Sequence, residues 1–391
     1  MHKHLQNLGT IQILLNPNIG INVIFLKLEI DNFYMFKNTV IDFTYPKEIT
    51  NSAIEGEYLE DFPKIKFKRV CILMGANASG KTSFGKVMCY INNYIAGSLD
   101  RDIPNYIRDK NKEASIEAVY VIPNSKTIHQ LKVIFNTEGW FSEEYKFCSL
   151  KKSKTLNDTL LELKNARKHT QKIINNFNFM STEMWRKVER TNNIWNYMYS
   201  DFKSSSESFK NTNLELLEKI LKSFDSSINS VAKIKESTND AYVIKFNNGD
   251  DVIVENGEML NPQRLSRGTL ESIEVVKFID HISSENINSS GSFFLDEKMA
   301  YSHSEIEVSV LNLLIEKLHR NSQLFYTTHN YDILEMSLPT HSYIFLKKDE
   351  FVEVFQPEKM GYTKNDRSLL GFVKNDVFGT LPDTSKIDSL L

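Results

Sequence analysis

The chain of 391 residues exceeds one ordinary domain, so it predicts two lobes or a core with a large insertion. Its 41% hydrophobic and 25% charged residues are typical of a soluble globular protein, and a net charge of −3 provides no general attraction to nucleic acid or an anionic membrane. Three irregularly spaced cysteines make neither a zinc motif nor a disulfide framework, which favours a cytoplasmic location. No apolar run is long enough to cross a bilayer, and residues 1–22 are expected to form an extension without a secretory signal.

The first predicted strands form a hairpin. Apolar residues alternate with mostly charged ones from Ile24 to Asp31, with the period of two that is typical of a strand. A turn at residues 32–38 separates this run from a second strand at Val40–Phe43. Further alternation over residues 115–150 predicts more antiparallel strands.

Residues 75–82 form a Gly-x4-Gly-Lys-Thr motif between an apolar run and a segment with a helical pattern. The glycines let consecutive backbone N–H groups point at phosphate oxygens, and the start of the helix adds unpaired donors. Lys81 can reach the β- and γ-phosphates, and the Thr82 hydroxyl can bind Mg²⁺. Because the motif lies in the strand–loop–helix context that its mechanism needs, it predicts nucleotide binding. The residues expected to contact the nucleotide here are Gly75, Asn77, Ala78, Ser79, Gly80, Lys81, Thr82 and Ser83.

The composition changes at about Lys151. Residues 151–230 are rich in Lys, Asn, Ser and Leu, carry leucines at helical spacing and show no strand pattern, so they predict an inserted helical subdomain. The aromatic residues between Met180 and Tyr199 are better explained by packing than by base stacking, and the lysines by a solvated face. Strand patterns return at Val231.

Three short motifs in the C-terminal part add chemistry to the phosphate loop. An apolar run ends in Asp296 and Glu297, which suit a Mg²⁺ ligand and a base for the attacking water. Residues 266–268 open a segment with a helical pattern, where bare amides make a second anion site, although alone this motif is more simply an ordinary capped helix. His329 follows a short apolar strand and can bond a γ-phosphate oxygen or water, although a lone histidine in such a place is usually structural.

The order of these motifs resembles that of ABC-type ATPases of the SMC/RecF-like branch. It is most similar to the compact AAA family members of bacterial phage-defence and abortive-infection systems. Residues 25–33 resemble the family's first strand, 75–82 its Walker A motif, 265–269 its signature, 293–297 its Walker B motif and 371–382 its C-terminal ending. His329 takes the place of the switch histidine, and His303 that of the D-loop histidine. The resemblance covers residues 23–385 and is weakest over the predicted insertion.

The chain departs from the family pattern at several points. Tyr34 stands where the family often has a basic residue, and Lys298–Tyr301 replaces a Ser-rich D-loop. Gln130 is only a weak candidate for the Q-loop glutamine. The segment after His329 is too short for the nuclease domain of some relatives, so no nuclease activity is expected.

The resemblance implies an α/β fold with an ABC-type P-loop NTPase head, which combines a mixed core sheet, an antiparallel β lobe and the inserted helical subdomain. The expected division is an extension at 1–22, the N-terminal part of the head at 23–150, the helical insertion at 151–230 and the C-terminal part at 231–391.

For activity, the resemblance implies ATP hydrolysis with Mg²⁺ by a head-to-tail homodimer or a higher homo-oligomer, with no membrane partner. Thr82 and Asp296 would hold the metal, Lys81, Glu297 and His329 would be catalytic, and Ser266, Arg267 and Gly268 would act on the partner's nucleotide. The favoured biological role is the ATPase and sensor subunit of an antiviral defence system with a separate protein effector. Two alternatives remain: a DNA-binding repair or recombination ATPase, and a scaffold that binds ATP without turnover.

Overall fold

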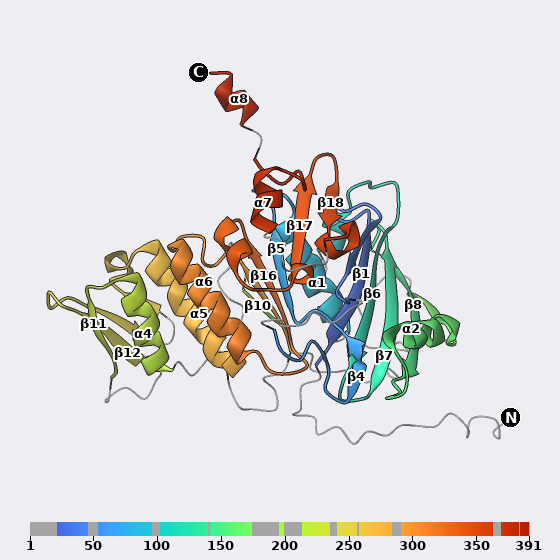
Figure 1. The fold of residues 1–391 in the computed structure, drawn as a ribbon, viewed down its shortest axis with the longest axis horizontal. Coiled ribbons are helices and arrows are strands. Elements are labelled where there is room, and N and C mark those ends of the chain that lie inside the picture. The colour runs from blue at the N-terminus through green and yellow to red at the C-terminus, as the bar shows by residue number, and fades with distance from the viewer. Residues whose placement is uncertain are drawn as a thin grey trace.

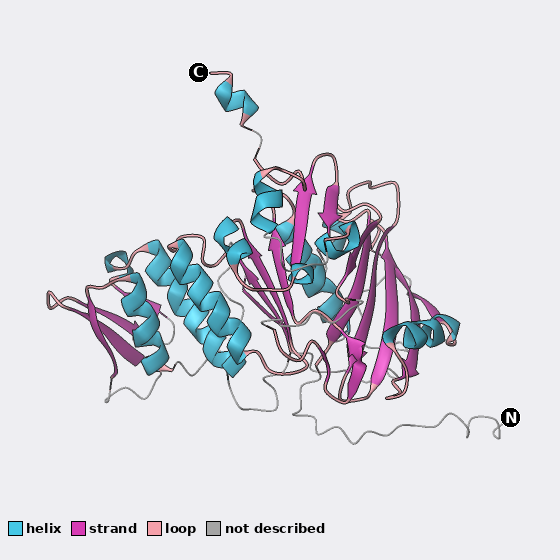
Figure 2. Ribbon diagram, viewed as in Figure 1, coloured by secondary structure: helices cyan, strands magenta, loops and turns pink. Residues whose placement is uncertain are grey.

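The structure, a computed structural model, places one helix between two six-stranded sheets and adds a further layer of helices and strands (Figure 1). It describes residues 22–45, 54–95, 102–139, 141–173, 195–198, 213–234, 241–255, 258–283, 291–362, 369–382 and 384–390. Figure 2 shows helices lying between and outside the sheets. This layering is the predicted α/β arrangement, with a mixed core sheet beside an antiparallel lobe.

The antiparallel sheet has the strand order β2-β1-β6-β7-β8-β9. Its strands are β1 (Ile24–Asp31), β2 (Thr39–Asp42), β6 (Ala114–Ile122), β7 (Thr127–Phe135), β8 (Phe141–Ser149) and β9 (His169–Ile173). The predicted hairpin is confirmed, with Leu28 opposite Ile41. One face packs on helix α1 (Lys81–Ile95), and the other is covered by the short hairpin β3 (Tyr58–Leu59) and β4 (Phe62–Lys66) and by helix α2 (Leu156–Asn165).

The core sheet has the strand order β10-β15-β16-β5-β17-β18. Its strands are β5 (Val70–Met74), β10 (Trp195–Met198), β15 (Ser292–Asp296), β16 (Gln323–Thr328), β17 (Tyr343–Lys348) and β18 (Val352–Phe355). Only β18 runs antiparallel to its neighbour, and β5, β15 and β16 are buried along their whole length. Helices on both faces explain these continuous apolar runs. Because β5, β15 and β16 are parallel, their carboxyl ends meet at one edge of the sheet, where the motifs lie.

Helices α5 (Arg267–Ser283) and α6 (Ser304–Lys317) cover the face of the core sheet opposite α1 (Figure 1). Beyond them lie α4 (Leu214–Phe224) and a four-stranded antiparallel sheet of β11 (Ile228–Lys233), β12 (Ala241–Phe246), β13 (Asp251–Glu255) and β14 (Glu258–Leu260). Short helices α7 (Leu369–Lys374) and α8 (Ser385–Asp388) follow the core sheet, and 3-10 turns occupy Ile103–Tyr106, Pro262–Arg264, Tyr331–Glu335, Thr340–Ser342 and Pro357–Met360. No described helix is long and apolar enough to span a membrane.

The prediction that residues 151–230 contain no strands is wrong. Within this range β9 extends the antiparallel sheet, β10 pairs with β15 in the core sheet, and β11 begins at Ile228. Strand β9 (His-Thr-Gln-Lys-Ile) has almost no apolar alternation, because its pairing with β8 rather than its own pattern makes it a strand. The helices predicted from leucine spacing do occur as α2 and α4, but α2 packs on the antiparallel lobe. Residues 174–194 and 199–212 of the predicted subdomain, and residues 1–21 of the predicted extension, lie outside the described residues.

The buried amide of Gln323 joins the two six-stranded sheets. Gln323, at the start of β16, accepts a hydrogen bond from Phe25 N (2.7 Å) and donates to Phe25 O (2.9 Å) and Lys68 O (3.1 Å). A buried amide is tolerated where its donors and acceptor are paired, as here. The bonds hold β1 and the segment before β5 against the core sheet.

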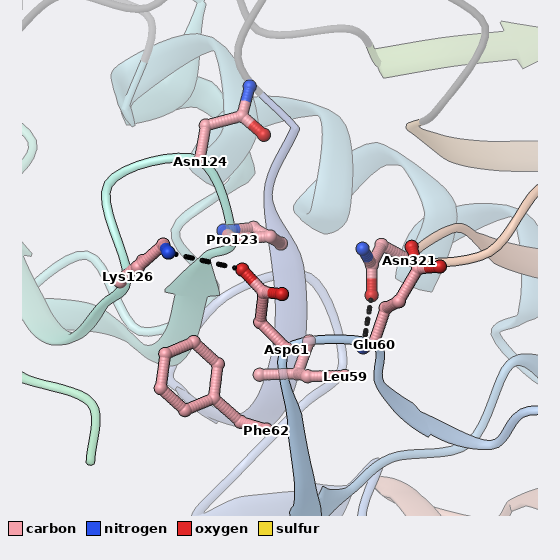
Figure 3. A pocket seen from close by; sticks show the side chains of 8 residues that line it. All are labelled: Leu59, Glu60, Asp61, Phe62, Pro123, Asn124, Lys126 and Asn321. Carbon is pink, nitrogen blue, oxygen red and sulfur yellow. Dashed lines mark hydrogen bonds and ion pairs between the residues drawn. The ribbon is translucent and has the colours of Figure 1, made fainter. Parts of the chain in front are cut away.

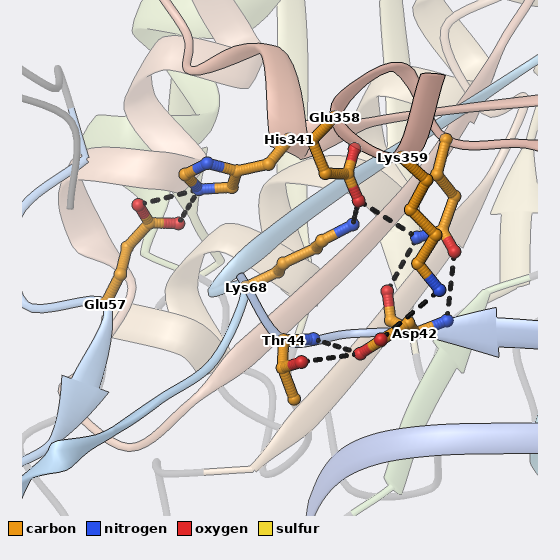
Figure 4. A network of polar contacts seen from close by, with 8 residues as sticks. Asp42, Thr44, Glu57, Lys68, His341, Glu358 and Lys359 are labelled. Carbon is orange, nitrogen blue, oxygen red and sulfur yellow. Dashed lines mark hydrogen bonds and ion pairs between the residues drawn. The ribbon is translucent and has the colours of Figure 1, made fainter. Parts of the chain in front are cut away.

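A buried ion pair and a buried histidine–carboxylate contact reinforce the edge of the core sheet that lies opposite the motifs (Figure 4). The ammonium of Lys68 is fully buried and donates to Glu358 Oε1 at 2.6 Å. His341 Nε2 lies 2.9 and 3.0 Å from the two carboxylate oxygens of Glu57, and Tyr45 stacks on the imidazole at 4.3 Å between ring centroids. Removing either partner would leave a buried polar or charged group without its partner, so these contacts fix the loops that enter β5 and β17.

His129 on β7 makes the antiparallel lobe sensitive to acid. Its ring bonds Thr127 Oγ1 and the Tyr145 hydroxyl, both at 2.6 Å, and burial lowers the pKa of His129 to about 3. The unfolded chain takes up a proton near pH 6.5 that the folded chain accepts only near pH 3. Stability therefore falls as pH decreases between these values, by about 1.4 kcal/mol per pH unit for this one residue.

We expect His129→Gln, which keeps a donor and an acceptor but does not titrate, to lose less stability than the wild type between pH 7 and pH 5. Chemical denaturation at a series of pH values measures this difference. His303→Gln, which changes an exposed histidine on another layer, serves as the control. Parallel losses in the wild type and His129→Gln would contradict the assignment.

Candidate nucleotide-binding site

The loop between β5 and α1 has the backbone of a phosphate cradle. Gly75 and Gly80 have φ values of 157° and 107°, and Ala78 has a positive φ of 61°. A Cβ atom on Gly75 would lie 2.2 Å from Leu346 O, so the loop is packed against β17 too closely for any side chain there. Ala78 and Gly80, with positive φ, alternate with Ser79 and Lys81, and such alternation turns successive backbone N–H groups to one side, which is the geometry that receives an anion.

Lys81 connects this loop to the acidic strand end, which is formed by Asp296 and Glu297 at the end of β15. Its ammonium donates to Gly75 O (2.8 Å) and Ala76 O (3.1 Å) and lies 3.1 Å from Glu297 Oε1. The Lys81 side chain is only 4% exposed, against 24% for that of Glu297. The ion pair joins two motifs that are distant in the sequence.

Asp296 forms the second link between the two motifs. Its Oδ2 accepts a hydrogen bond from Thr82 Oγ1 at 2.7 Å, and its Oδ1 accepts one from Thr327 Oγ1 at 2.5 Å. The carboxyl group is completely buried. Burial raises the pKa of Asp296, whereas the hydrogen bonds from the two threonines and the nearby charge of Lys81 oppose that rise.

These residues fit ATP with Mg²⁺. Mg²⁺ prefers oxygen ligands and is commonly held by one or two protein groups together with phosphates and water, and the hydroxyl of Thr82 and the carboxylate of Asp296 lie together. In the described part of the chain, no group of three or more His, Cys, Asp or Glu residues is placed to hold a metal ion. The Ser79 hydroxyl, whose residue is 3% exposed, is buried without a hydrogen-bond partner among the described residues, so it is free to bond a ligand.

The other predicted phosphate-loop residues lie around this centre. Asn77 and Ala78 are exposed at the tip of the loop, and Ser83 is half-buried in the first turn of α1. Gly80 packs on Val352 so closely that a Cβ atom there would lie 2.8 Å from Val352 Cγ2. The strand β18 therefore also shapes the loop.

The predicted signature residues lie at the start of α5. Ser266 caps the helix, since its Oγ accepts from Thr269 N at 3.1 Å. Gly268 is buried against the D-loop region, where a Cβ atom would lie 2.6 Å from Tyr301 O. The guanidinium of Arg267 lies 3.7 Å from the centre of the exposed Tyr301 ring and bonds Glu271 at 3.2 Å. Among the described residues no hydrogen bond or ion pair joins 266–268 to the phosphate loop of the same chain.

His329 is exposed just beyond β16. The residues on either side of it, Thr328 and Asn330, are held by hydrogen bonds to Glu307. The buried carboxylate of Glu307, in the first turn of α6, accepts hydrogen bonds from the Tyr326 hydroxyl (2.8 Å), Thr328 Oγ1 (2.7 Å) and Asn330 Nδ2 (2.9 Å). Sequence reasoning missed Glu307, which follows no motif and is revealed only by its contacts.

Two residues at which the chain departs from the family pattern make contacts of another kind. Tyr34 has a positive φ of 51° and stacks on Tyr106 at 4.7 Å, which explains an aromatic side chain at that position. Gln130 points to Glu117 on the neighbouring strand of the antiparallel sheet, so its contacts give no support to a Q-loop role.

A hollow of about 370 Å³ lies at the opposite edge of the sheets (Figure 3). It is bordered by Asp61 and Lys126, 3.2 Å apart, and by Asn321, whose Oδ1 accepts from Glu60 N at 3.1 Å. Asn321 precedes β16, whereas the phosphate loop follows the parallel strand β5, so this hollow is separate from the candidate site.

Comparisons with solved structures find likeness at low sequence identity. A structure of an SMC head bound to the C-winged helix domain of ScpA has 13% identity and a TM-score of 0.47. The SMC head domain from Thermotoga maritima has 11% identity and a TM-score of 0.41, and the recombination mediator protein RecF with ATPrS in the RecFOR pathway has 10% and 0.42. Each comparison covers 86% of this chain and 99% of the other chain. No family model matches the sequence, and no curated protein matches it.

Proposed function

We propose that this protein is a Mg²⁺-dependent ATPase that works as a head-to-tail homodimer. The proposal rests on two contacts between the phosphate loop and the end of β15, in which neighbouring residues of the loop each contact one of two neighbouring carboxylates. Lys81 lies 3.1 Å from Glu297, and Thr82 donates to Asp296 at 2.7 Å. A charged lysine, a hydroxyl and two carboxylates with distinct partners suit the binding and hydrolysis of a nucleoside triphosphate.

Each side chain has a separate task in this proposal. Backbone N–H groups of residues 75–80 cradle the phosphates, and Lys81 exchanges its carbonyl partners for phosphate oxygens. Thr82 and Asp296 would hold Mg²⁺, which supplies charge neutralisation on the phosphates when bound. Glu297 takes the proton of the attacking water, and His329 contacts the γ-phosphate or that water.

The signature residues would act on the nucleotide held by a second copy. Ser266 and the start of α5 present a capped helix end with backbone N–H donors, and Arg267 adds a positive charge on the exposed side. No described contact brings these residues to the phosphate loop of their own chain, which supports action across a dimer interface.

The head-to-tail arrangement predicts recovery of activity when two inactive variants are mixed. Lys81→Ala damages the phosphate loop, and Gly268→Asp damages the signature by a clash with Tyr301 and by negative charge. A mixed dimer contains one site with both halves intact. An equal mixture should therefore recover about a quarter of the wild-type ATPase rate if the subunits pair at random.

The measurement is phosphate release by each variant alone and by the mixture. Ser266→Glu can replace Gly268→Asp, since it adds negative charge without entering the contact with Tyr301. If both mixtures stay as inactive as their separate components while the wild type is active, the two halves of the site do not come from different copies.

For biological role, we propose a cytoplasmic ATPase and sensor subunit of an antiviral defence system with a separate protein effector. Support comes from the resemblance of the motif order to compact phage-defence ATPases. The test is loss of protection against phage when Glu297→Gln replaces the wild type, together with co-purification of an effector. Instead, DNA binding with a steep salt dependence and no effect on phage would favour a repair or recombination ATPase.

A further inference from the structure

The carboxyl end of β16 carries two neighbouring threonines whose hydroxyl groups serve different partners. Thr328 donates to Glu307 and so belongs to the anchor of the His329 segment. Thr327 is completely buried and faces the acidic strand end instead. Its Oγ1 lies 2.5 Å from Asp296 Oδ1 and 3.0 Å from Glu297 N.

The directions of these two hydrogen bonds follow from the atoms involved. A backbone N–H only donates, so Thr327 Oγ1 accepts from Glu297. The single hydroxyl hydrogen of Thr327 is then available to the Asp296 carboxylate, which accepts. One hydroxyl therefore contacts both members of the acidic pair, and both contacts exist without nucleotide.

The contact with Asp296 determines how its carboxylate is turned. Thr327 holds Oδ1, and Oδ2 accepts from Thr82 of the phosphate loop. Strands β15 and β16 are parallel neighbours, with Asp296 opposite Thr327, so the sheet itself sets this geometry. Hydrogen-bond partners of metal-holding carboxylates commonly orient them in this way.

The contact with Glu297 fixes an unusual backbone conformation. Glu297 has a φ of 49°, which is sparsely populated for a residue with a side chain. Its N–H donates to both Thr327 O (3.2 Å) and Thr327 Oγ1 (3.0 Å). This conformation turns the chain at the strand end, and the Glu297 carboxylate reaches Lys81.

We infer that Thr327 is a positioning residue of the ATPase reaction. It directs the Asp296 carboxylate toward Thr82 and holds the Glu297 backbone so that the base lies at the phosphate loop. This role rests on the proposed function, but the geometry it describes is present in the free protein.

The test uses two substitutions that separate the hydroxyl from the shape of the side chain. Thr327→Val keeps the shape and removes the hydroxyl, whereas Thr327→Ser keeps the hydroxyl and removes a methyl group. The control, Thr159→Val, removes a buried hydroxyl from α2, where Thr159 Oγ1 donates to Thr155 O at 2.8 Å. All variants are first compared with the wild type by thermal unfolding.

We expect Thr327→Val to lower kcat by about 10- to 100-fold, with ATP affinity in the absence of Mg²⁺ close to wild type. Hydrogen–deuterium exchange of the Glu297 amide, measured without nucleotide, should become faster. Thr327→Ser should restore both readouts, and Thr159→Val should change neither.

Two results would overturn the inference. One is a Thr327→Val variant whose kcat and amide exchange stay within about twofold of the wild type. The other is a Thr327→Ser variant impaired as strongly as Thr327→Val, which would assign the effect to packing. If the wild type itself does not hydrolyse ATP, the proposed function fails, whereas the exchange measurement still tests the role of Thr327 in the free protein.

Discussion

Glu297→Gln is expected to bind ATP and to hydrolyse it about 10²- to 10⁴-fold more slowly than the wild type, the usual contribution of a general base. Glutamine has nearly the same shape but does not accept a proton at neutral pH. The positive-φ backbone and the bonds to Thr327 involve main-chain atoms of residue 297, so they should survive the substitution. ATP bound without hydrolysis should also hold two copies together.

Single-turnover phosphate release measures the chemical step, and native mass measurement with ATP and Mg²⁺ measures the dimer. The control is Glu305→Gln, which changes an exposed carboxylate in the first turn of α6. Hydrolysis at the wild-type rate would show that Glu297 is not the base. Slow hydrolysis without dimer accumulation would retain the base and reject nucleotide-driven closure.

Lys81→Ala is expected to reduce ATP affinity by roughly tenfold to 150-fold, which corresponds to about 1.5–3 kcal/mol for a charge-assisted hydrogen bond to phosphate. The Lys81 ammonium is buried among the carbonyl groups of the loop and the Glu297 carboxylate, where ATP phosphates would be received. Removing it leaves a negative carboxylate facing a negative ligand.

Equilibrium titration with a fluorescent ATP analogue measures this loss. Lys86→Ala, on the same helix α1, is the matched control, and thermal unfolding of both variants checks the fold. ATP binding by Lys81→Ala at the wild-type affinity would exclude the loop at residues 75–82 as the phosphate site.

Local pattern was sufficient to predict the strands, loop and helix that carry the candidate site where they are adjacent in the sequence. The phosphate loop, the acidic strand end and the hairpin at residues 24–43 depend on spacing and on strand or helix periodicity, and the structure places each as predicted. The meeting of Lys81 with Glu297 follows from parallel strands that end at one edge.

Residues that work through a distant partner could not be predicted in this way. Thr327 matters because β16 pairs with β15, and Glu307 because α6 packs over the end of β16. Strand β10 has its partner β15 far along the chain, and β9 pairs with β8 across helix α2; their own short patterns do not distinguish a strand from a loop or helix. In each case tertiary contact determines the role of the residue, and local propensity is too weak a signal.

The lysine at the phosphate loop also determines how an ATP affinity should be interpreted. Because Lys81 already bonds two carbonyl groups and a carboxylate, nucleotide binding is an exchange reaction, and the observed free energy is the difference between two sets of contacts. Neutralising Glu297 weakens the contacts that Lys81 makes in the free protein and loses when ATP binds. Glu297→Gln should therefore bind ATP at least as tightly as the wild type, so its inactivity cannot be confused with poor binding.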